Sequence, residues 1–261
     1  NADDAKMHDE SIREGQHRLS YGFSEEASVR VSDAAVAYED DRAVGIRAQV
    51  RYQDTELPLT VRGVLGNHQF YPLAGALAVA AAEGIMFADA VHALDAHMFP
   101  PGRMRILPGR EGLTLIDDSY NSSPSAVLAG LDAVDAVRCA GRKIVVLGDM
   151  LELGDHAANE HRAVGARVAG VADVFVGVGV RMRTATQAAK EAATSRVSRI
   201  ETVQTAQEAR ALLADIVRPN DLVYVKGSQS MRMERIVEAL LEHPDKAPDL
   251  LVRQDKEWKA R

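Results

Sequence analysis

The sequence of 261 residues is poor in cysteine, in aromatic residues and in long apolar runs. Cys139 is the single cysteine, which excludes an internal disulfide and a cysteine-rich metal site and fits a reducing compartment such as the cytoplasm. No apolar stretch approaches the roughly 20 residues of a membrane-spanning helix, so we expect no membrane insertion. Basic residues are also scarce, at 31 against 38 acidic ones. The resulting net charge of −7 argues against a nucleic-acid-binding protein.

Two further absences concern function and extent. No Gly-Lys-Thr or Gly-Lys-Ser occurs in the chain, so it has no phosphate-binding loop of that type. The sequence does not begin with methionine, and its first residues, NADDAKMHDE, are too acidic and polar for a signal peptide. We expect the sequence to begin partway through a longer protein.

The first hundred residues are predicted to form strands followed by helices. Stretches rich in β-branched residues and separated by polar turns indicate strands at 28–40, 43–53 and 56–65. Ala-rich and apolar-periodic stretches indicate helices at 71–84 and 87–98. The motif FPPGR at 99–103 then places two prolines and a glycine between periodic segments. It predicts a boundary between domains at 1–100 and 101–261.

After this boundary, strands and helices are predicted to alternate. Short Val- and Ile-rich strands are expected at 113–117, 143–149, 173–179, 199–203 and 221–227. Helices with apolar residues three and four apart are expected at 124–137, 159–170, 183–193, 206–217 and 231–242. Such alternation is typical of an α/β domain with a mostly parallel sheet. The charged tail from residue 244 shows no such pattern, and we expect it to be loosely held.

Polar residues gather where the strand LTLIDD ends. In open parallel sheets, ligands bind beyond the carboxyl ends of the strands. Asp118 has the chemistry to bind ribose hydroxyls, and Asn121 to bind a base or a phosphate. Ser123 suits a helix N-cap, and the N-terminus of that helix favours anions. The alternative is that Asp117 and Asn121 only cap a turn, as such residues often do.

Two more loops are predicted at the same sheet edge. LGDMLELGDHAANEH presents Asp149, Glu152 and His161, of which Glu152 and His161 could bind a substrate amine or a metal. VKGSQSMRME follows another strand and suits a carboxylate or phosphate through Lys226 and Ser228. Alternatively, His161 is a polar residue on a helix face, and the second loop is a simple connection.

Four motifs, in this order and spacing, resemble the C-terminal half of the Mur ligases, the ATP-dependent amide ligases of peptidoglycan synthesis. They are PPGRM at 100–104, IDDSYNSSP at 116–124, VLGDMLELG at 146–154 with His161 after it, and VKGSQSMRME at 225–234. The second and third are similar to those of the branch that adds D-Ala-D-Ala. The resemblance covers nearly the whole chain and is weakest between about residues 5 and 60.

The resemblance implies a three-domain enzyme of which this chain covers the end of the central ATP-binding domain and a Rossmann-like C-terminal domain. The implied reaction uses ATP and Mg²⁺ to phosphorylate the terminal carboxylate of UDP-N-acetylmuramoyl-tripeptide. The amine of D-Ala-D-Ala then attacks the acyl phosphate to form an amide. The catalytic residues of the central domain are expected upstream of this chain, which should therefore be inactive alone.

The same resemblance implies roles for individual residues. Arg103 is similar to a hinge arginine near the nucleotide phosphates, whose alternative is a solvated surface charge. Asp118 and Asn121 are similar to nucleotide-binding residues. Lys226 and Ser228, with Asp149, Glu152 and His161, are expected on the substrate side.

One motif of the central domain departs from the family pattern. His68 matches a nucleotide-binding histidine, but Gln69 and Pro72 replace the two asparagines that usually follow it. Because Pro72 offers no side-chain hydrogen bond, this departure leaves two other hypotheses open. The chain could be a non-catalytic Rossmann-like binding module, or a ligase of this type for another amino acid.

Overall fold

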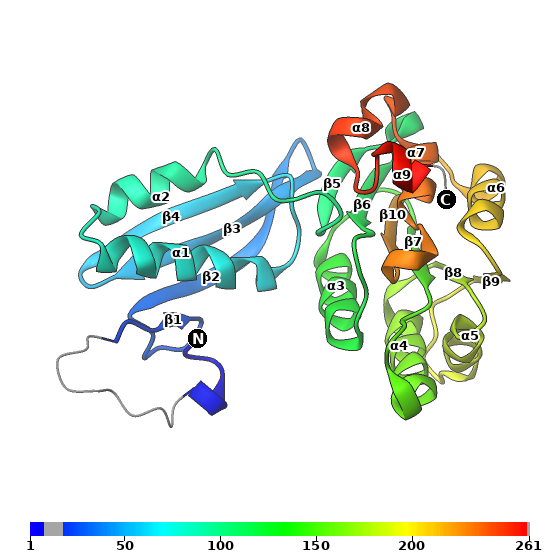
Figure 1. The fold of residues 1–261 in the computed structure, drawn as a ribbon, viewed down its shortest axis with the longest axis horizontal. Coiled ribbons are helices and arrows are strands. Elements are labelled where there is room, and N and C mark those ends of the chain that lie inside the picture. The colour runs from blue at the N-terminus through cyan, green and yellow to red at the C-terminus, as the bar shows by residue number, and fades with distance from the viewer. Residues whose placement is uncertain (8–17, 260–261) are drawn as a thin grey trace. The chain divides into compact units, whose positions relative to one another are not determined.

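The computed structural model describes residues 1–7 and 18–259, which form two compact units. The first unit comprises Asn1–Glu39 and Val44–Met98, and the second comprises Asp40–Ala43 and Phe99–Arg261. Each unit has its own sheet (Figure 1). Within the described residues, no helix combines the length and the apolarity that crossing a membrane requires.

The first unit is a four-stranded sheet with helices against it. The strands follow the order β1-β2-β3-β4, with bounds Tyr21–Gly22, Val29–Glu39, Arg42–Tyr52 and Thr55–Arg62. Helix α1 (Phe70–Ala82) packs on β1 and β2, and α2 (Phe87–Leu94) packs on β4. Asp40 and Asp41 connect β2 to β3 with φ of 46° and 62°. Two residues with positive φ match the tight turn that suits the twist of a hairpin.

The second unit contains a six-stranded sheet of order β5-β6-β10-β7-β8-β9. Their bounds are Arg105–Pro108, Thr114–Asp118, Leu222–Lys226, Lys143–Gly148, Val174–Val178 and Arg199–Val203. All neighbours pair in parallel except β5 and β6. Strands β7, β8 and β10 are buried along their whole length, which explains their continuous Val and Ile content. The predicted α/β class with a mostly parallel sheet is confirmed.

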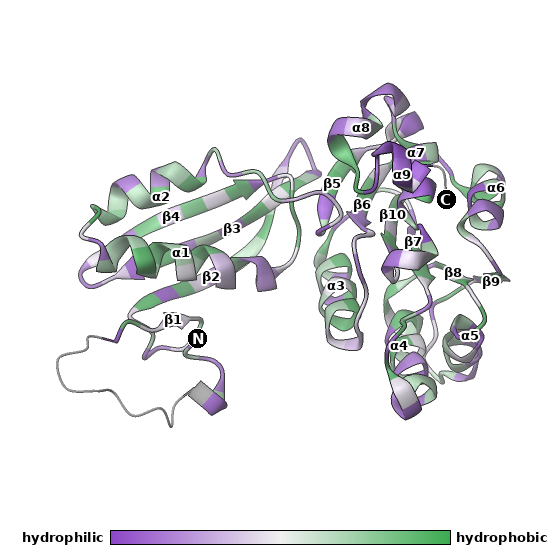
Figure 2. Ribbon diagram, viewed as in Figure 1, coloured by the Kyte–Doolittle hydropathy of each residue, from purple (hydrophilic) through white to green (hydrophobic). Residues whose placement is uncertain are grey.

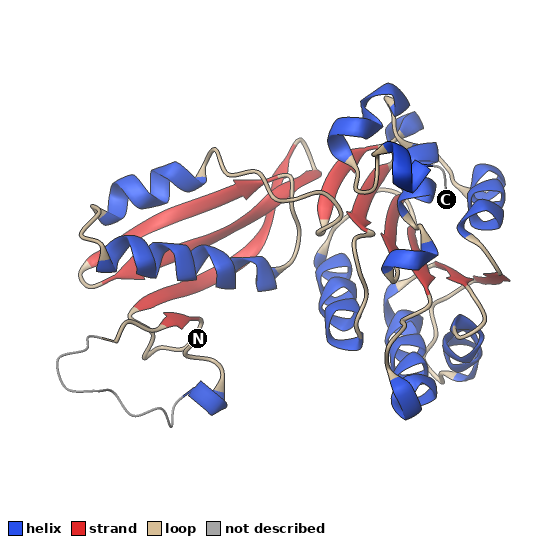
Figure 3. Ribbon diagram, in the orientation of Figure 1, coloured by secondary structure: helices blue, strands red, loops and turns tan. Residues whose placement is uncertain are grey.

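Helices cover both faces of this sheet (Figures 2 and 3). Helix α4 (Ala157–Val171) contacts both α3 (Pro124–Ala136) and α5 (Met182–Glu191). The apolar cluster of the opposite face joins the sheet to α6 (Ala206–Ile216) and α7 (Glu234–Leu240). Helix α6 begins with a capping box, since Thr205 accepts a hydrogen bond from the Glu208 amide and Glu208 accepts one from the Gln204 amide.

Two features of this unit differ from the prediction. The antiparallel strand β5 was not expected, because its four residues end in Pro108 and lie next to the boundary motif. The tail is also more ordered than its charge suggests. It forms α8 (Ala247–Leu250) and α9 (Lys256–Lys259), and Ala247 and Leu251 are buried in the apolar cluster beside α7. The tail is therefore part of the folded unit.

Candidate functional site

The strand order brings three loops together at one edge of the second sheet. The chain passes from β6 to β7, and β10 returns later to lie between them. In register, Lys226 at the end of β10 lies opposite Asp118 of β6 and Leu147 of β7. The loops that follow these three strands therefore start side by side. Such a switch in strand order is where open α/β sheets bind ligands.

A buried ion pair lies at the base of this edge. Lys226 Nζ is 2.7 Å from Asp118 Oδ2 and donates to the Asn121 carbonyl at 2.9 Å. The Tyr224 hydroxyl donates to the same Asp118 oxygen at 3.2 Å. Burial and the nearby Asp118 carboxylate raise the pKa of Tyr224 well above its usual value, so it remains a donor. Gly130 of α3 makes room for this hydroxyl, because a Cβ there would lie 2.1 Å from it.

Asp117 holds the loop after β6 from inside. Its carboxylate accepts hydrogen bonds from the Gly102 amide at 3.1 Å and from the Ser119 amide and hydroxyl at 3.1 and 2.6 Å. Burial raises the pKa of Asp117 to about 6, and the hydrogen bonds from Ser119 oppose this rise. Asp117 thus joins the boundary motif to the candidate loop, in keeping with the turn-capping interpretation of this residue.

Asp149 points away from the loops and toward α5. Its carboxylate accepts a hydrogen bond from the Met182 amide at 2.8 Å, at the first residue of that helix. Gly179, with φ of 105°, allows this approach, since a Cβ there would lie 2.5 Å from the Asp149 carboxyl carbon. This side chain was expected to contact the substrate, but its carboxylate binds the start of α5 and does not line the cleft described below. Asp149 instead contributes its carbonyl, which accepts from the Ser228 amide at 3.1 Å.

His161 also acts from behind the loop. It is fully buried, its Nδ1 lies 2.6 Å from the Ala157 carbonyl, and its Nε2 lies 3.2 Å from the Met150 amide. An imidazole that donates at Nδ1 and accepts at Nε2 satisfies both contacts. Both ring nitrogens are thus engaged within the protein, which leaves neither for a substrate or a metal in this arrangement. His161 therefore orders the loop after β7.

Ser228 connects the loops after β7 and β10. Its hydroxyl accepts a hydrogen bond from the Leu151 amide at 2.9 Å, and the residue is buried. Glu152 follows in the same loop with φ of 63°, an uncommon conformation for a residue other than glycine, and is exposed. This arrangement sets Glu152 at the surface beside Ser228, where a ligand can reach both.

The tail supplies a residue that the sequence did not indicate. Arg253 Nη2 lies 2.9 Å from Glu234 Oε2 and also donates to the Ser119 carbonyl, and Nη1 donates to the Tyr120 carbonyl at 3.0 Å. Both partners of this ion pair are buried, at 4% and 1% side-chain exposure. Arg253 therefore fixes the loop after β6 against α7. No local pattern around residue 253 predicts these contacts, because Glu234 is 19 residues away in sequence and Ser119 and Tyr120 are more than 130 residues away.

The three loops and the tail enclose a cleft of about 690 Å³, which we call the loop cleft. Asn121, Glu152 and Ser228 line it, as the sequence predicted for a site at this edge. Its other lining residues are Ser122, Ser123, Leu151, Leu153, Gln229, Ser230, Arg232 and Trp258. Ser123 stands at the N-cap of α3, but its side chain makes no capping hydrogen bond. Asp118 and Lys226 lie in the layer beneath the cleft.

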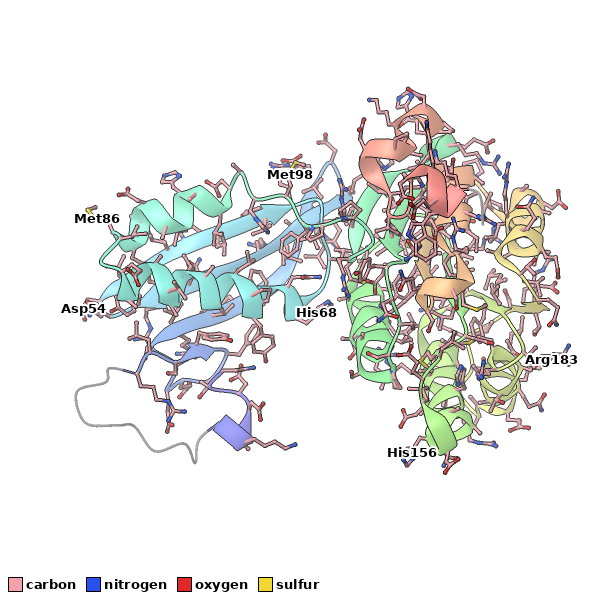
Figure 4. The ribbon with its side chains drawn as sticks, viewed as in Figure 1. Asp54, His68, Met86, Met98, His156 and Arg183 are labelled. Atoms are coloured by element: carbon pink, nitrogen blue, oxygen red, sulfur yellow. The ribbon has the colours of Figure 1, made fainter. Side chains whose placement is uncertain are left out.

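Arg103 and His68 lie outside the loop cleft's lining. Arg103 is exposed, and its guanidinium carbon lies 4.3 Å from the centre of the Tyr120 ring, a cation–π contact next to Asn121. His68 belongs to the first unit, in the turn Asn67–Gln69 that precedes α1, with Gln69 Nε2 3.3 Å from its Nε2 (Figure 4). Pro72 occupies the first turn of α1, where an amide proton is not needed.

Known proteins share both the sequence and the fold. Residues 102–229 match the family model described as Mur ligase, glutamate ligase domain. UDP-N-acetylmuramoyl-tripeptide–D-alanyl-D-alanine ligase of Bacillus subtilis is 31% identical over 69% of this chain and 39% of its own length. The protein of that name from Mycobacterium leprae is 34% identical over 72% and 38%. The chain thus spans about two fifths of the curated relatives it matches.

The fold comparison agrees with the sequence comparison. The crystal structure of MurF ligase from Thermotoga maritima in complex with ADP superposes with a TM-score of 0.70 and 23% identity, over 87% of this chain and 49% of that one. MurF from Acinetobacter baumannii also gives a TM-score of 0.70, at 24% identity over 84% and 46%. The resemblance inferred from the four motifs is confirmed. The chain belongs to the Mur ligase family, whose glutamate ligase domain it contains at residues 102–229.

Proposed function

We propose that this chain is part of an ATP-dependent ligase that joins D-Ala-D-Ala to UDP-N-acetylmuramoyl-tripeptide, a step of peptidoglycan precursor synthesis in the cytoplasm. The curated relatives bear the name of this activity. The observation that supports the proposal most strongly is the loop cleft. There the motifs IDDSYNSSP, GDMLELG and VKGSQSMRME, dispersed over more than a hundred residues, come together.

The lining of the loop cleft suits a short peptide with both of its termini free. Its lining residues include one cation, Arg232, and one anion, Glu152. A zwitterionic dipeptide offers a carboxylate to the first and an amine to the second. Leu151 and Leu153 provide apolar surface for the alanine methyl groups. We therefore assign the acceptor D-Ala-D-Ala to this cleft, with Ser228 as a further binding residue beside the two charged ones.

The domain assignment forms part of the proposal. Residues 1–100 are assigned to the C-terminal portion of the central ATP-binding domain and 101–261 to the Rossmann-like domain. Because Gly-Lys-Thr/Ser is absent from the sequence, the phosphate-binding loop of the ligase lies outside these residues. In this proposal Arg103, Asn121 and His68 contact ATP. Asp118 is also assigned to ATP binding, although its carboxylate forms a buried ion pair with Lys226 beneath the cleft.

Mg²⁺ is the ion that the family reaction implies. Among residues 1–7 and 18–259, no three His, Cys, Asp or Glu side chains gather as metal ligands would. Glu152 is the one acid among the lining residues of the loop cleft, and the buried Asp118 beneath them faces the Lys226 ammonium. We therefore assign none of the described residues to the ion.

The contribution of this chain to the reaction is the placement of the amine. Phosphorylation of the tripeptide carboxylate gives an acyl phosphate and ADP. The dipeptide nitrogen attacks the carbonyl carbon, loses a proton, and phosphate leaves as the amide forms. Holding the amine in a fixed orientation lowers the entropic cost of this bimolecular step. The buried network of Asp117, Lys226, His161 and Arg253 keeps the loops in place for this purpose.

Binding of the acceptor tests the proposal. Trp258 is the only tryptophan and lines the loop cleft, so its fluorescence reports occupancy. We expect saturable binding of D-Ala-D-Ala, weaker binding of D-Ala and L-Ala-L-Ala, and roughly tenfold weaker binding of the dipeptide to Glu152→Gln. Asp155→Asn, a nearby exposed acid outside the lining, is the matched control. Equal binding of single amino acids would favour another acceptor, and no binding of any of these ligands would favour a non-catalytic module.

A further inference from the structure

A second cavity shares Arg232 with the loop cleft and has no part in the function proposed above. It has a volume of about 540 Å³ and lies among α6, α7 and the tail, and we call it the tail pocket. Gln207 and Arg210 of α6 line it, together with Arg235 and Glu238 of α7. Its other lining residues are Arg232, Glu234, Ala239, Pro244, Arg253, Gln254 and Lys259.

The tail pocket is basic in a protein that is acidic as a whole. Five of its lining side chains are basic and two are acidic, against a net charge of −7 for the chain. Glu234 is shared between two of the arginines, at 2.7 Å from Arg232 Nε and 2.9 Å from Arg253 Nη2. Arg210, Arg235 and Lys259 form no ion pair within the described residues. The pocket therefore carries a surplus of positive charge that its own acids do not neutralise.

Two buried polar atoms of the pocket point to a ligand. Arg232 Nη1 is buried and has no hydrogen-bond partner among the described residues, although the Nε of the same side chain is bonded to Glu234. Gln254 Oε1 is likewise buried without a partner, while its Nε2 donates to the Val252 carbonyl at 3.3 Å. A buried donor or acceptor left unpaired destabilises the folded protein. A ligand that offers both an anion and a hydroxyl would satisfy the two atoms together.

We propose that the tail pocket binds a small organic phosphate ester, separately from the loop cleft. Guanidinium groups match phosphate oxygens with paired hydrogen bonds, and Arg210, Arg232 and Arg235 present three of them. The Gln254 carbonyl oxygen accepts a hydroxyl of the esterified part. Because Arg232 lines both cavities, the ligand is sensed at the loop cleft through this residue.

The position of Trp258 makes this proposal measurable. The guanidinium carbons of Arg232 and Arg253 lie 5.3 and 5.9 Å from the centre of its ring. An anion that binds Arg232 changes the electric field at the Trp258 indole ring. Glycerol 3-phosphate is the probe, added to the whole chain at constant ionic strength set with chloride. We expect a saturable change in Trp258 fluorescence that weakens as salt is raised.

Variants separate the tail pocket from general charge effects. Arg210→Ala/Arg235→Ala removes two of its cations, and we expect at least about tenfold weaker binding of glycerol 3-phosphate. Arg162→Ala/Arg183→Ala removes the same charge from two exposed arginines of α4 and α5 and should leave binding unchanged. Arg183 is labelled in Figure 4. Arg210→Glu alone, at an exposed position, repeats the test where the double variant fails to fold.

Three outcomes would overturn the proposal. The first is a fluorescence change that does not saturate or that chloride reproduces. The second is equal binding by the Arg210→Ala/Arg235→Ala variant and by wild type. The third concerns the ligand class, since inorganic phosphate or citrate binding as tightly as glycerol 3-phosphate would refute the assignment of an ester. D-Ala-D-Ala is titrated in the absence of glycerol 3-phosphate and so probes the loop cleft by itself. Failure of the tail-pocket test therefore leaves the proposed function standing.

Discussion

Replacing Lys226 with methionine tests the buried pair beneath the loop cleft. Lys226→Met keeps much of the side-chain volume but removes the ammonium that lies 2.7 Å from Asp118 Oδ2. The carboxylate then keeps the Tyr224 hydroxyl at 3.2 Å but loses its opposite charge. Side-chain exposure of 2% and 6% leaves little room for water to replace the lysine. Breaking a buried pair from one side costs about 3–5 kcal/mol.

Proton uptake sets an upper limit on this cost. An unpaired Asp118 can bind a proton in the folded variant. At pH 7 this costs about 1.4 kcal/mol for each of the roughly three pH units that separate pH 7 from the ordinary carboxyl pKa of about 3.9. We therefore expect a loss of about 3–4 kcal/mol at pH 7. Because protonation becomes easier as the pH falls, the loss should shrink to about 1.5 kcal/mol at pH 5.

Urea unfolding followed through Trp258 provides the assay, since this residue lies in the second unit with the pair. The double variant Asp118→Asn/Lys226→Met removes both charges and should recover at least about 2 kcal/mol relative to the sum of the single variants. The reasoning is refuted where Lys226→Met costs less than about 1 kcal/mol at pH 7. Additive effects of the two single changes would refute it equally.

Three further predictions concern neighbouring parts of the site. The raised pKa of Asp117, about 6 against 3.8, means that the folded state binds a proton more tightly than the unfolded state. Relative to Asp117→Asn, wild type should thus lose up to about 3 kcal/mol as the pH rises from about 4 to 6.5, and a flat difference in urea titrations would contradict this. Arg253→Lys keeps the charge but not the fork that joins Glu234 to two carbonyls, and it should cost about 1.5–3 kcal/mol, whereas Arg183→Lys should change stability by less than about 0.5 kcal/mol. Gly130→Ala should destabilise by about 1–3 kcal/mol because its Cβ meets Tyr224, while the matched Gly170→Ala on α4 gains up to about 1 kcal/mol from helix propensity; the reverse order of thermal midpoints would refute the close packing.

The sequence predicted the parallel sheet because its strands have a local signature. Runs such as KIVVLG are buried on both faces and alternate with amphipathic helices, and both patterns are visible in short windows. Strand β5 lacks this signature, since it has four residues, ends in Pro108 and lies at the edge of the sheet. Pairing with β6 decides its conformation, and pairing is not a local property.

The candidate site was predicted in position but only partly in detail. Asn121, Glu152 and Ser228 line the loop cleft because strand ends place their loops there. Asp149 begins the loop after β7 and His161 lies in the helix α4 that follows this loop, yet their side chains bond inward, to the start of α5 and to the Met150 amide. The direction of a side chain depends on neighbours distant in sequence. The same reason explains why Arg253 and Trp258 in the charged tail gave no signal.

Locating the dipeptide on the protein tests the central claim most directly. The measurement is an isotope-filtered NMR experiment that detects contacts between the methyl groups of D-Ala-D-Ala and the side chains of the labelled protein. The account predicts contacts with Leu151, Leu153 and the Trp258 ring, which line the loop cleft. Contacts confined to residues of the tail pocket, or to the first unit, would contradict it.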